Sequence, residues 1–206
     1  MTFPTKSYST IANFCDDYVG QLARAAGSID QDRLADASDL LDDTFQQGKW
    51  LYVCGNGGSA AIANHLLCDY AKCIQTDTNV RPRVISLSAN LEMITAIAND
   101  IEYDDCFSYQ LATTGQPGDV LMTISASGDS ENIVRAIKWA SENGMHSIAL
   151  TGFNGGRSAE LASINLHVDG DNYGIIEDAH QSIMHILAQY LRQAHMVDDT
   201  IVERKF

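Results

Sequence analysis

The chain has 206 residues and a formal net charge of −14, because 27 Asp and Glu outnumber 13 Lys and Arg. An acidic excess this large argues against a nucleic-acid partner, since phosphate backbones are bound by clustered basic side chains. The sequence has no run of about 18 apolar residues that would span a membrane, no apolar stretch typical of a secretory signal, and no C-x-x-C pair among its five cysteines. We therefore expect a cytoplasmic protein with reduced thiols.

Two amphipathic helices are predicted at the start of the chain. Apolar residues recur at helical spacing over 11–25 and again over 34–45, and Gly48 ends the second pattern. The aspartates of the second segment lie mainly off its apolar stripe, which indicates a solvated acidic face. We expect residues 1–48 to form a helical extension that packs on the core, on a partner subunit, or on both.

The rest of the chain alternates between short apolar runs and helical patterns. This alternation predicts an α/β fold, a three-layer α/β/α sandwich with a five-stranded parallel sheet of flavodoxin-like topology, in a single domain over 1–206. The predicted strands are 50–54, 83–88, 119–125, 146–151 and 164–168. The predicted helices are 59–73, 91–98 with Asn90 as its N-cap, 104–113, 130–142, 156–162 and 175–195.

A glycine-rich turn, Gly55-Asn56-Gly57-Gly58-Ser59, joins the first of these strands to a helix. Such a turn leaves several backbone N–H groups unpaired at the sheet edge where α/β proteins bind ligands. Its spacing matches neither the dinucleotide fingerprint G-x-G-x-x-G nor the P-loop, which ends in Gly-Lys-Ser/Thr. From this stretch alone, a ligand-binding turn and a plain strand-to-helix turn remain equally open.

A serine-rich turn, Ser125-Ala126-Ser127-Gly128-Asp129-Ser130, follows the third strand. Three hydroxyls beside a helix N-terminus can bind a phosphate without lysine or arginine. The alternative is an ordinary N-cap, but a cap needs only one such residue. Asp129 counts against phosphate binding unless its carboxylate points away. A third turn, over 151–156, is interpreted as structural.

Histidines and carboxylates form another candidate constellation. His65 and Asp69 are four residues apart and share a helix face, where they could hold a metal or act as an acid–base pair. The terminal helix offers Glu177, His180, Gln181 and His185. Glu177 and His185 are separated by about 12 Å along an ideal helix and about 80° around it, so a straight helix cannot offer both to one small ion. Either Glu177 precedes the helix, or two subunits share the site.

Taken together and in order, these motifs resemble the sugar isomerase (SIS) fold, and within it the phosphoheptose isomerase family. The resemblance also rests on Ala98-Asn99-Asp100, whose alternative reading is a helix C-terminus with Asn in the left-handed conformation, on Gly118–Leu121, and on Met184–Leu187. It covers nearly the whole chain. It implies conversion of sedoheptulose 7-phosphate to D-glycero-D-manno-heptose 7-phosphate through an ene-diol, in a homotetramer with shared active sites that serves surface-glycan heptose synthesis.

The resemblance also implies roles for single residues. Asp69 and His185 match the acid–base pair. The substrate-binding positions are Asn56, Gly57, Gly58, Ser59, Asp69, Asn99, Asp100, Ser125, Ala126, Ser127, Ser130 and Glu177. In family members that bind zinc, one ion per subunit, the ligands match His65, Asp69, Glu177 and His185.

Four residues depart from the family pattern: Asp69 replaces a glutamate, Glu177 a glutamine, Ala126 a threonine and Asp129 an asparagine. These changes put the substrate preference in question, and Glu177 would make a zinc site more negative. Two other functions are weighed: a non-catalytic SIS protein that binds a replication initiator, and a sugar-phosphate-sensing module. A pure scaffold has no need of the histidine–carboxylate set, and a sensor would keep the serine turn without the acid–base pair.

Overall fold

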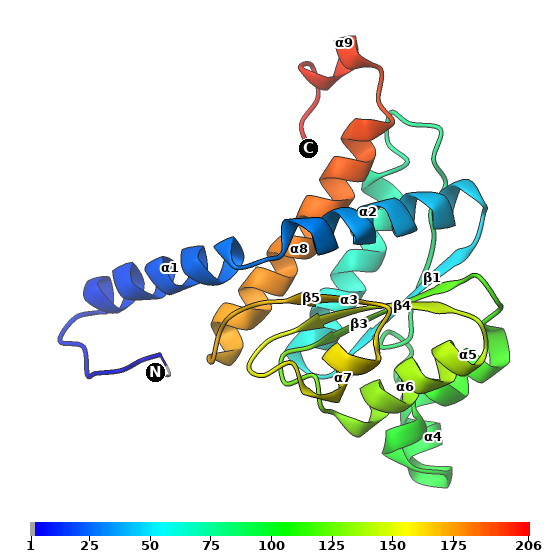
Figure 1. Ribbon diagram of the computed structural model, residues 1–206, viewed down its shortest axis with the longest axis horizontal. Helices are drawn as coiled ribbons and strands as arrows, with labels where there is room; N and C mark the ends of the chain where they lie inside the picture. The colour runs from blue at the N-terminus through cyan, green and yellow to red at the C-terminus, as the bar shows by residue number, and fades with distance from the viewer. Residues whose placement is uncertain (1–2) are drawn as a thin grey trace.

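A five-stranded parallel sheet forms the centre of the molecule (Figure 1). The computed structural model describes residues 3–206, with the side chains of 3–197 and 200–206. The strands are β1 (Trp50–Gly55), β2 (Arg83–Ser86), β3 (Val120–Ser125), β4 (His146–Thr151) and β5 (Ile164–His167), in the order β2-β1-β3-β4-β5. This is the flavodoxin-like order, and the predicted fold class is confirmed.

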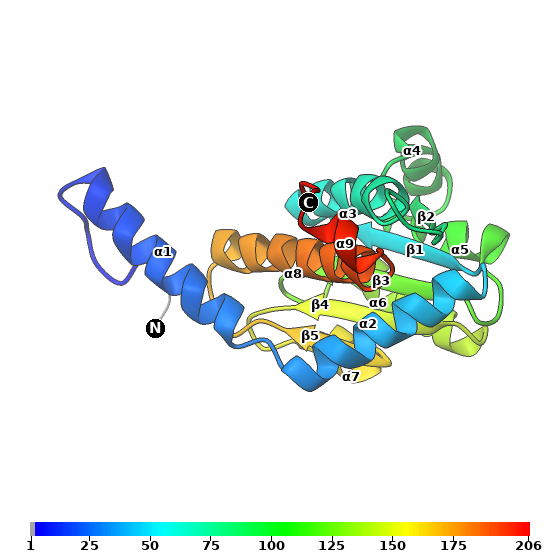
Figure 2. The same cartoon turned by 90° about the horizontal axis from the view of Figure 1, so that it is seen from above.

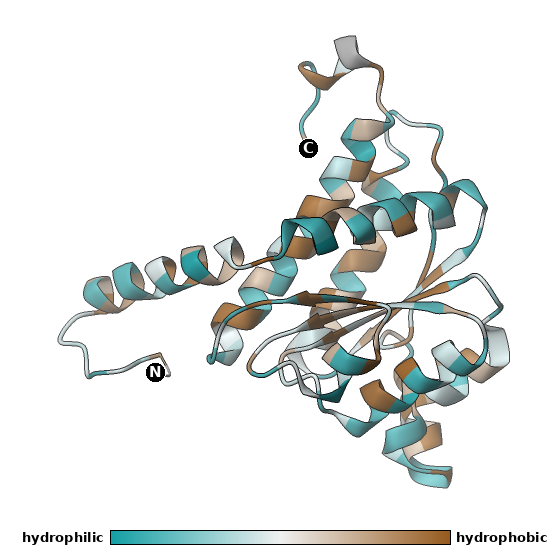
Figure 3. Cartoon of the chain, in the orientation of Figure 1, coloured by the Kyte–Doolittle hydropathy of each residue, from teal (hydrophilic) through white to brown (hydrophobic). Residues whose placement is uncertain are grey.

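Helices cover both faces of the sheet. On one face lie α2 (Gln31–Gln46), α3 (Gly58–Cys68) and α8 (Tyr173–Ala194), and on the other α4 (Leu91–Asp100), α5 (Ser108–Thr114), α6 (Glu131–Glu142) and α7 (Gly156–Leu161) (Figure 1). The strands supply both cores, because successive side chains point to opposite faces. Leu51 and Val53 join the core beneath α2, α3 and α8, while Tyr52 and Cys54 join the other. Figure 3 shows the hydrophobic residues along the strands and the helices that pack on them.

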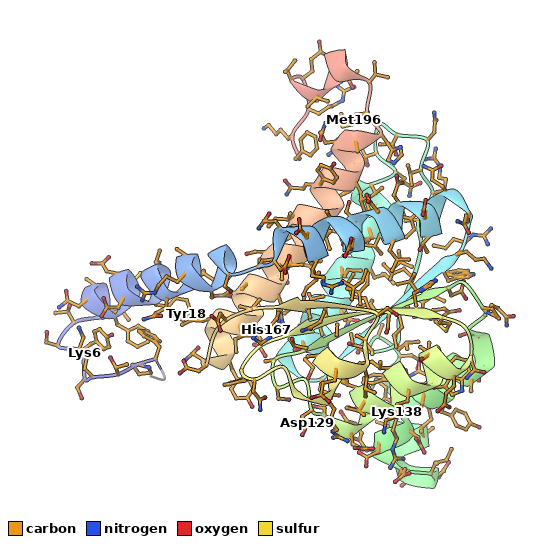
Figure 4. All side chains as sticks on the ribbon, viewed as in Figure 1. Lys6, Tyr18, Asp129, Lys138, His167 and Met196 are labelled. Atoms are coloured by element: carbon orange, nitrogen blue, oxygen red, sulfur yellow. The ribbon has the colours of Figure 1, made fainter. Side chains whose placement is uncertain are left out.

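The two N-terminal helices are confirmed, and they pack differently. The apolar stripe of α2 is buried on the sheet, with Ala37 and Leu41 fully enclosed. In contrast, α1 (Ile11–Gly27) projects beyond the body of the molecule (Figures 1 and 2), and Ile11 is 82% exposed. Its attachment includes Tyr18, whose hydroxyl donates to Asp178 on α8 at 2.6 Å (Figure 4). The aspartates of α2 are mostly exposed, as the sequence predicts.

Two predicted helices are each split in the structure. The helix predicted over 59–73 ends at Cys68 and continues as a π-helical segment, η1 (Asp69–Cys73), in which the N–H of Ile74 bonds to the carbonyl of Asp69. The helix predicted over 104–113 becomes a 3₁₀ turn, η2 (Tyr103–Asp105), followed by α5.

The C-terminus adds a short helix that the sequence pattern does not predict, α9 (Asp198–Ile201). Within residues 3–206, no helix has both the length and the apolar character needed to cross a membrane.

Candidate active site

A pocket opens at the carboxyl end of the sheet, where the turns after β1 and β3 lie side by side. This is the point at which the strand order reverses, and α/β sheets bind ligands there. The pocket is lined by Asn56, Ser59, Ile124, Ser125, Ala126, Ser127, Ser130, Tyr173 and Glu177. None of these lining residues is Lys or Arg, so an anion in this pocket must be held by hydroxyls and backbone N–H groups.

The serine turn presents its hydroxyls in a form suited to an anion. Ser125 Oγ accepts from the N–H of Gly128 at 3.1 Å, and Ser127 Oγ accepts from the N–H of Asp129 at 3.3 Å. Each hydroxyl proton is therefore free to be donated to a ligand. Ser130 is the N-cap residue of α6, yet its side chain makes no capping hydrogen bond. The ordinary N-cap interpretation thus does not account for Ser130.

The turn after β4 supports the serine turn from behind. Gly128 and Gly156 both have positive φ, and a Cβ added at Gly156 would lie 2.6 Å from the carbonyl oxygen of Ser127. The N–H of Ser158 also donates to the carbonyl of Gly128 at 2.8 Å. The structural role predicted for residues 151–156 is consistent with these backbone contacts.

Asp129 lies at the outer rim of the turn, beside α7 (Figure 4), and its carboxylate is paired with Arg157. The Arg157 side chain holds the pKa of this carboxyl below its usual range by hydrogen bonding to it. Asp129 is exposed and is not among the lining residues of the pocket. Its carboxylate is therefore directed to Arg157 and not into the pocket.

The turn after β1 lies against Glu177 of α8. Gly58 begins α3, and a Cβ there would lie 2.6 Å from a carboxylate oxygen of Glu177. Only glycine fits at this position without displacing that side chain. Burial raises the pKa of Glu177, and the negative charge of Asp178 raises it further.

Asn56 is held by a pair of amide hydrogen bonds that the sequence does not reveal. Its Nδ2 donates to Asn132 Oδ1 at 2.9 Å, while Asn132 Nδ2 donates back to Asn56 Oδ1 at 3.0 Å. Tyr103 also donates to Asn56 Oδ1 at 2.8 Å. Asn132 is buried on α6, so this contact ties the first turn to the helix that follows the serine turn. Its position in an amphipathic helix gives no signal for this role.

A second polar cluster lies farther along α3 and α8. Asp69 Oδ2 is 2.8 Å from His185 Nδ1, and Asp69 Oδ1 is 3.5 Å from His65 Nε2. Gln181 Nε2 donates to the remaining nitrogens, His65 Nδ1 and His185 Nε2, at 3.0 Å each. Asp69 is mostly buried, with a side chain 16% exposed, whereas the two imidazoles are more open. The cluster therefore combines a carboxylate with two oriented histidines.

This cluster has the donor atoms of a metal site. One ligand atom from each of His65, Asp69 and His185 lies within 4.8 Å of the others. Two imidazoles and one carboxylate form a donor set that zinc binds tetrahedrally, with a fourth position left open. Metal-binding histidines usually hydrogen-bond through the other ring nitrogen. Gln181 supplies that partner to both rings, because its amide can present either NH₂ or oxygen.

Glu177 is not part of this cluster within one chain. The helices α3 and α8 run side by side, with Gly58 beside Glu177 and Asp69 beside His185. Glu177 lies inside α8, two turns before His185, so the alternative that it belongs to a preceding loop is wrong. A four-ligand site that includes Glu177 is not assembled by a single chain, because two helical turns span about 11 Å.

Asn99 and Asp100 lie apart from the pocket in the same chain. Both are exposed in the last turn of α4, where Asn99 Nδ2 donates to Asp100 Oδ1 at 2.7 Å. Neither is among the lining residues, and Asn99 does not have the left-handed conformation considered above. His180, another candidate, is fully buried and its Nε2 lies 3.1 Å from the carbonyl oxygen of Thr151. It belongs to the core.

Comparison with known proteins places the fold in a family. The family model described as "SIS domain" matches residues 14–152. A phosphoheptose isomerase from Synechocystis is 39% identical over 151 residues, covering 73% of this chain and 77% of the relative. A probable phosphoheptose isomerase from Thermoplasma acidophilum is 36% identical over 82% of this chain and 93% of the relative.

Solved structures agree. The phosphoheptose isomerase of Neisseria gonorrhoeae superimposes with a TM-score of 0.81 at 30% identity, over 89% of this chain and all of that one. The phosphoheptose isomerase of Francisella tularensis gives a TM-score of 0.81 at 29% identity, over 92% of this chain and all of that one. The parallel sheet with its serine-lined pocket is thus that of an SIS-domain protein. Within this class, the chain belongs to the phosphoheptose isomerase family. The predicted fold, family and isomerase class are confirmed.

Proposed function

We propose that this enzyme interconverts sedoheptulose 7-phosphate and D-glycero-D-manno-heptose 7-phosphate. The observation that carries the proposal is the presence in one chain of a serine-lined pocket free of basic side chains and a carboxylate–histidine pair. The first suits a sugar phosphate, and the second suits proton transfer next to a carbonyl. The choice of a heptose phosphate as the substrate rests on membership of the phosphoheptose isomerase family.

The phosphate is bound by the serine turn. Hydroxyls of Ser125, Ser127 and Ser130 donate to its oxygens, with the backbone N–H of Ala126 and the N-terminus of α6. Asn56, Gly57, Gly58 and Ser59 form the sugar-facing rim. Binding energy from the phosphate, remote from the reacting carbons, holds the substrate in position for the proton transfers.

Two side chains carry out the isomerisation. Asp69 removes the carbon-bound proton next to the carbonyl, which gives an ene-diol. His185 moves a proton between the two oxygens of that ene-diol, and Asp69 returns its proton to the neighbouring carbon. The 2.8 Å contact between Asp69 and His185 keeps both groups at one reaction centre.

His65, Asp69 and His185 would hold a zinc ion, one per subunit. When bound, the ion supplies electrophilic polarisation of the substrate carbonyl. Gln181 would orient both imidazoles by hydrogen bonding to the nitrogens that do not face the ion.

The active site is shared between subunits of a homotetramer. Glu177, Asn99 and Asp100 lie apart from the His65–Asp69–His185 cluster of their own chain, and α1 exposes apolar side chains that a partner would cover. Residues 3–48 then serve both as cover for the sheet and as an assembly surface within a single SIS domain; residues 1 and 2 lie outside the described part. We place the enzyme in the cytoplasm.

The test is to supply sedoheptulose 7-phosphate, with and without a chelator, and to follow aldoheptose phosphate. The expected result is turnover, reduced by the chelator. Absence of turnover with added zinc would reject the isomerase activity. Phosphate-ester binding without turnover would favour the sensing module, and neither binding nor turnover would favour the scaffold.

A further inference from the structure

Arg157 lies just outside the serine-lined pocket and contacts the serine turn through several hydrogen bonds. Arg157, the second residue of α7, donates through Nε to Asp129 Oδ1 at 2.5 Å and through Nη2 to the carbonyl oxygen of Asp129 at 2.9 Å. Its Nη1 also donates to Glu131 Oε2 at 2.7 Å. One guanidinium thus contacts both carboxylates that flank Ser130 in sequence.

Both of these carboxylates are charged at neutral pH. Hydrogen bonding to Arg157 lowers the pKa of Asp129, and it is also the largest cause of the lowered pKa of Glu131. Asp129 is one residue from Ser130 and donates its own N–H to Ser127 Oγ. The negative charges of Asp129 and Glu131 therefore lie next to the hydroxyls that are proposed to bind a phosphate dianion.

The pocket has no cation of its own with which to offset them. Its described lining residues include Glu177 and no Lys or Arg. The other arginine at this end of α6 is Arg135, which already pairs with Glu102, Asp104 and Asp105 besides Glu131. Among the side chains that the structure describes, Arg157 is the cation that pairs with Asp129.

We propose that Arg157 is an electrostatic shield for the phosphate-binding turn, which lets an acidic rim coexist with a dianion site. The inference rests on the proposed function, because it needs the serine turn to bind phosphate. Arg157 is not among the lining residues of the pocket. It acts through Asp129 and Glu131 and is thus a positioning residue for substrate charge, expected to affect KM and not kcat.

The competing role is a mechanical brace, in which the arginine fork only fixes the shape of the turn. The two roles can be distinguished by substitutions that change the charge and the shape of the side chain separately. A shield tolerates Arg157→Lys, which keeps the charge, whereas a brace does not, because a lysine cannot reproduce the fork. The triple variant Asp129→Asn/Glu131→Gln/Arg157→Gln removes both carboxylates as well. If Arg157 is a shield, this variant recovers phosphate binding; if Arg157 is a brace, it stays defective.

The experiment measures KM and kcat for sedoheptulose 7-phosphate and, independently of turnover, the Kd of inorganic phosphate by calorimetry. Arg157→Gln should raise both KM and Kd about five-fold at low salt, with kcat unchanged. This difference should shrink as ionic strength rises, since the Debye length falls from about 30 Å at 0.01 M to about 3 Å at 1 M. The control is Arg83→Gln, the same charge change on an exposed arginine at the amino end of β2.

Recovery in the triple variant and near-normal binding by Arg157→Lys would support the shield. Failure of the triple variant to recover, an effect insensitive to salt, or an equal effect of Arg83→Gln would overturn it. A wild-type protein that binds phosphate without isomerising the heptose would reject the proposed function alone, while the phosphate arm still decides on the shield. A wild-type protein that does not bind phosphate would overturn the shield.

Discussion

Asp69 Oδ2 lies 2.8 Å from His185 Nδ1, a contact that joins the first residue of the π-helical segment to the middle of α8. The contact brings together two residues that are 116 positions apart in the sequence. It pairs a carboxylate, which accepts a proton, with an imidazole, which can both accept and donate one. π-Helical turns are rare in proteins, and those that occur are often found at functional sites. The catalytic proposal depends on this pair.

Replacing Asp69 with asparagine should lower kcat by about 10²- to 10⁴-fold, because an amide cannot accept the carbon-bound proton. Calorimetry with inorganic phosphate should give an unchanged Kd, since the serine turn is intact. Asp36→Asn, on the exposed face of α2, is the control for loss of one carboxylate and should behave as wild type. Full turnover by Asp69→Asn would reject Asp69 as the base.

Zinc content should depend on the cluster. We expect His65→Ala and His185→Ala to lose most bound zinc after dialysis, because each removes one of three protein ligands. The ratio of metal to protein, determined by mass spectrometry, checks this without any activity assay. His146→Ala is the matched control, an exposed histidine at the start of β4. Equal zinc in all three variants would mean that the ion is bound elsewhere.

Gly58→Ala should displace the Glu177 carboxylate from the turn after β1 and destabilise the protein by no more than about 1 kcal/mol, because the added Cβ would overlap only the end of that flexible side chain. Thermal unfolding measures the effect. Gly20→Ala, where a Cβ meets nothing within 4 Å, should instead be neutral or stabilising, since alanine favours the α1 helix. In a Glu177→Ala background the added cost of Gly58→Ala should largely disappear. Persistence of the full cost there would place the conflict elsewhere.

The stability of the fold should fall as the pH drops from about 6.5 to about 4. Burial lowers the pKa of His180 to about 4, so across this interval the unfolded state binds a proton that the folded state rejects. The loss attributable to this group is about 3 kcal/mol. Urea unfolding at several pH values should show a shallower decline for His180→Gln, which retains a donor for the Thr151 carbonyl. Parallel declines would exclude His180 as the cause.

Strands and turns were predictable because their signals are local. The central strands β1 and β3 are buried on both faces and read as nearly continuous apolar runs, which end at Gly55 and Ser125. The segments over 59–73 and 104–113 were predicted as single helices because their apolar spacing is continuous. The breaks after Cys68 and at Cys106 fall where the sequence has no glycine or proline, so no local signal marks them.

The site was predictable only in part. Ser125, Ser127 and Ser130 follow one strand, so the topology brings them to the sheet edge together. The pairing of Asn56 with Asn132 depends on how α6 packs against the first turn, and no spacing rule relates them. The placement of Glu177 beside Gly58 likewise depends on the alignment of α3 with α8.

The backbone contact between the serine turn and the turn after β4 constrains how this family can vary. Neither Gly128 nor Gly156 can accept a side chain unless the opposite loop moves, because each faces the main chain of the other turn. A substitution that enlarges either glycine therefore requires a compensating change in the other loop. A chimaera that exchanges one loop with a relative should fold poorly, whereas exchanging both should preserve the fold.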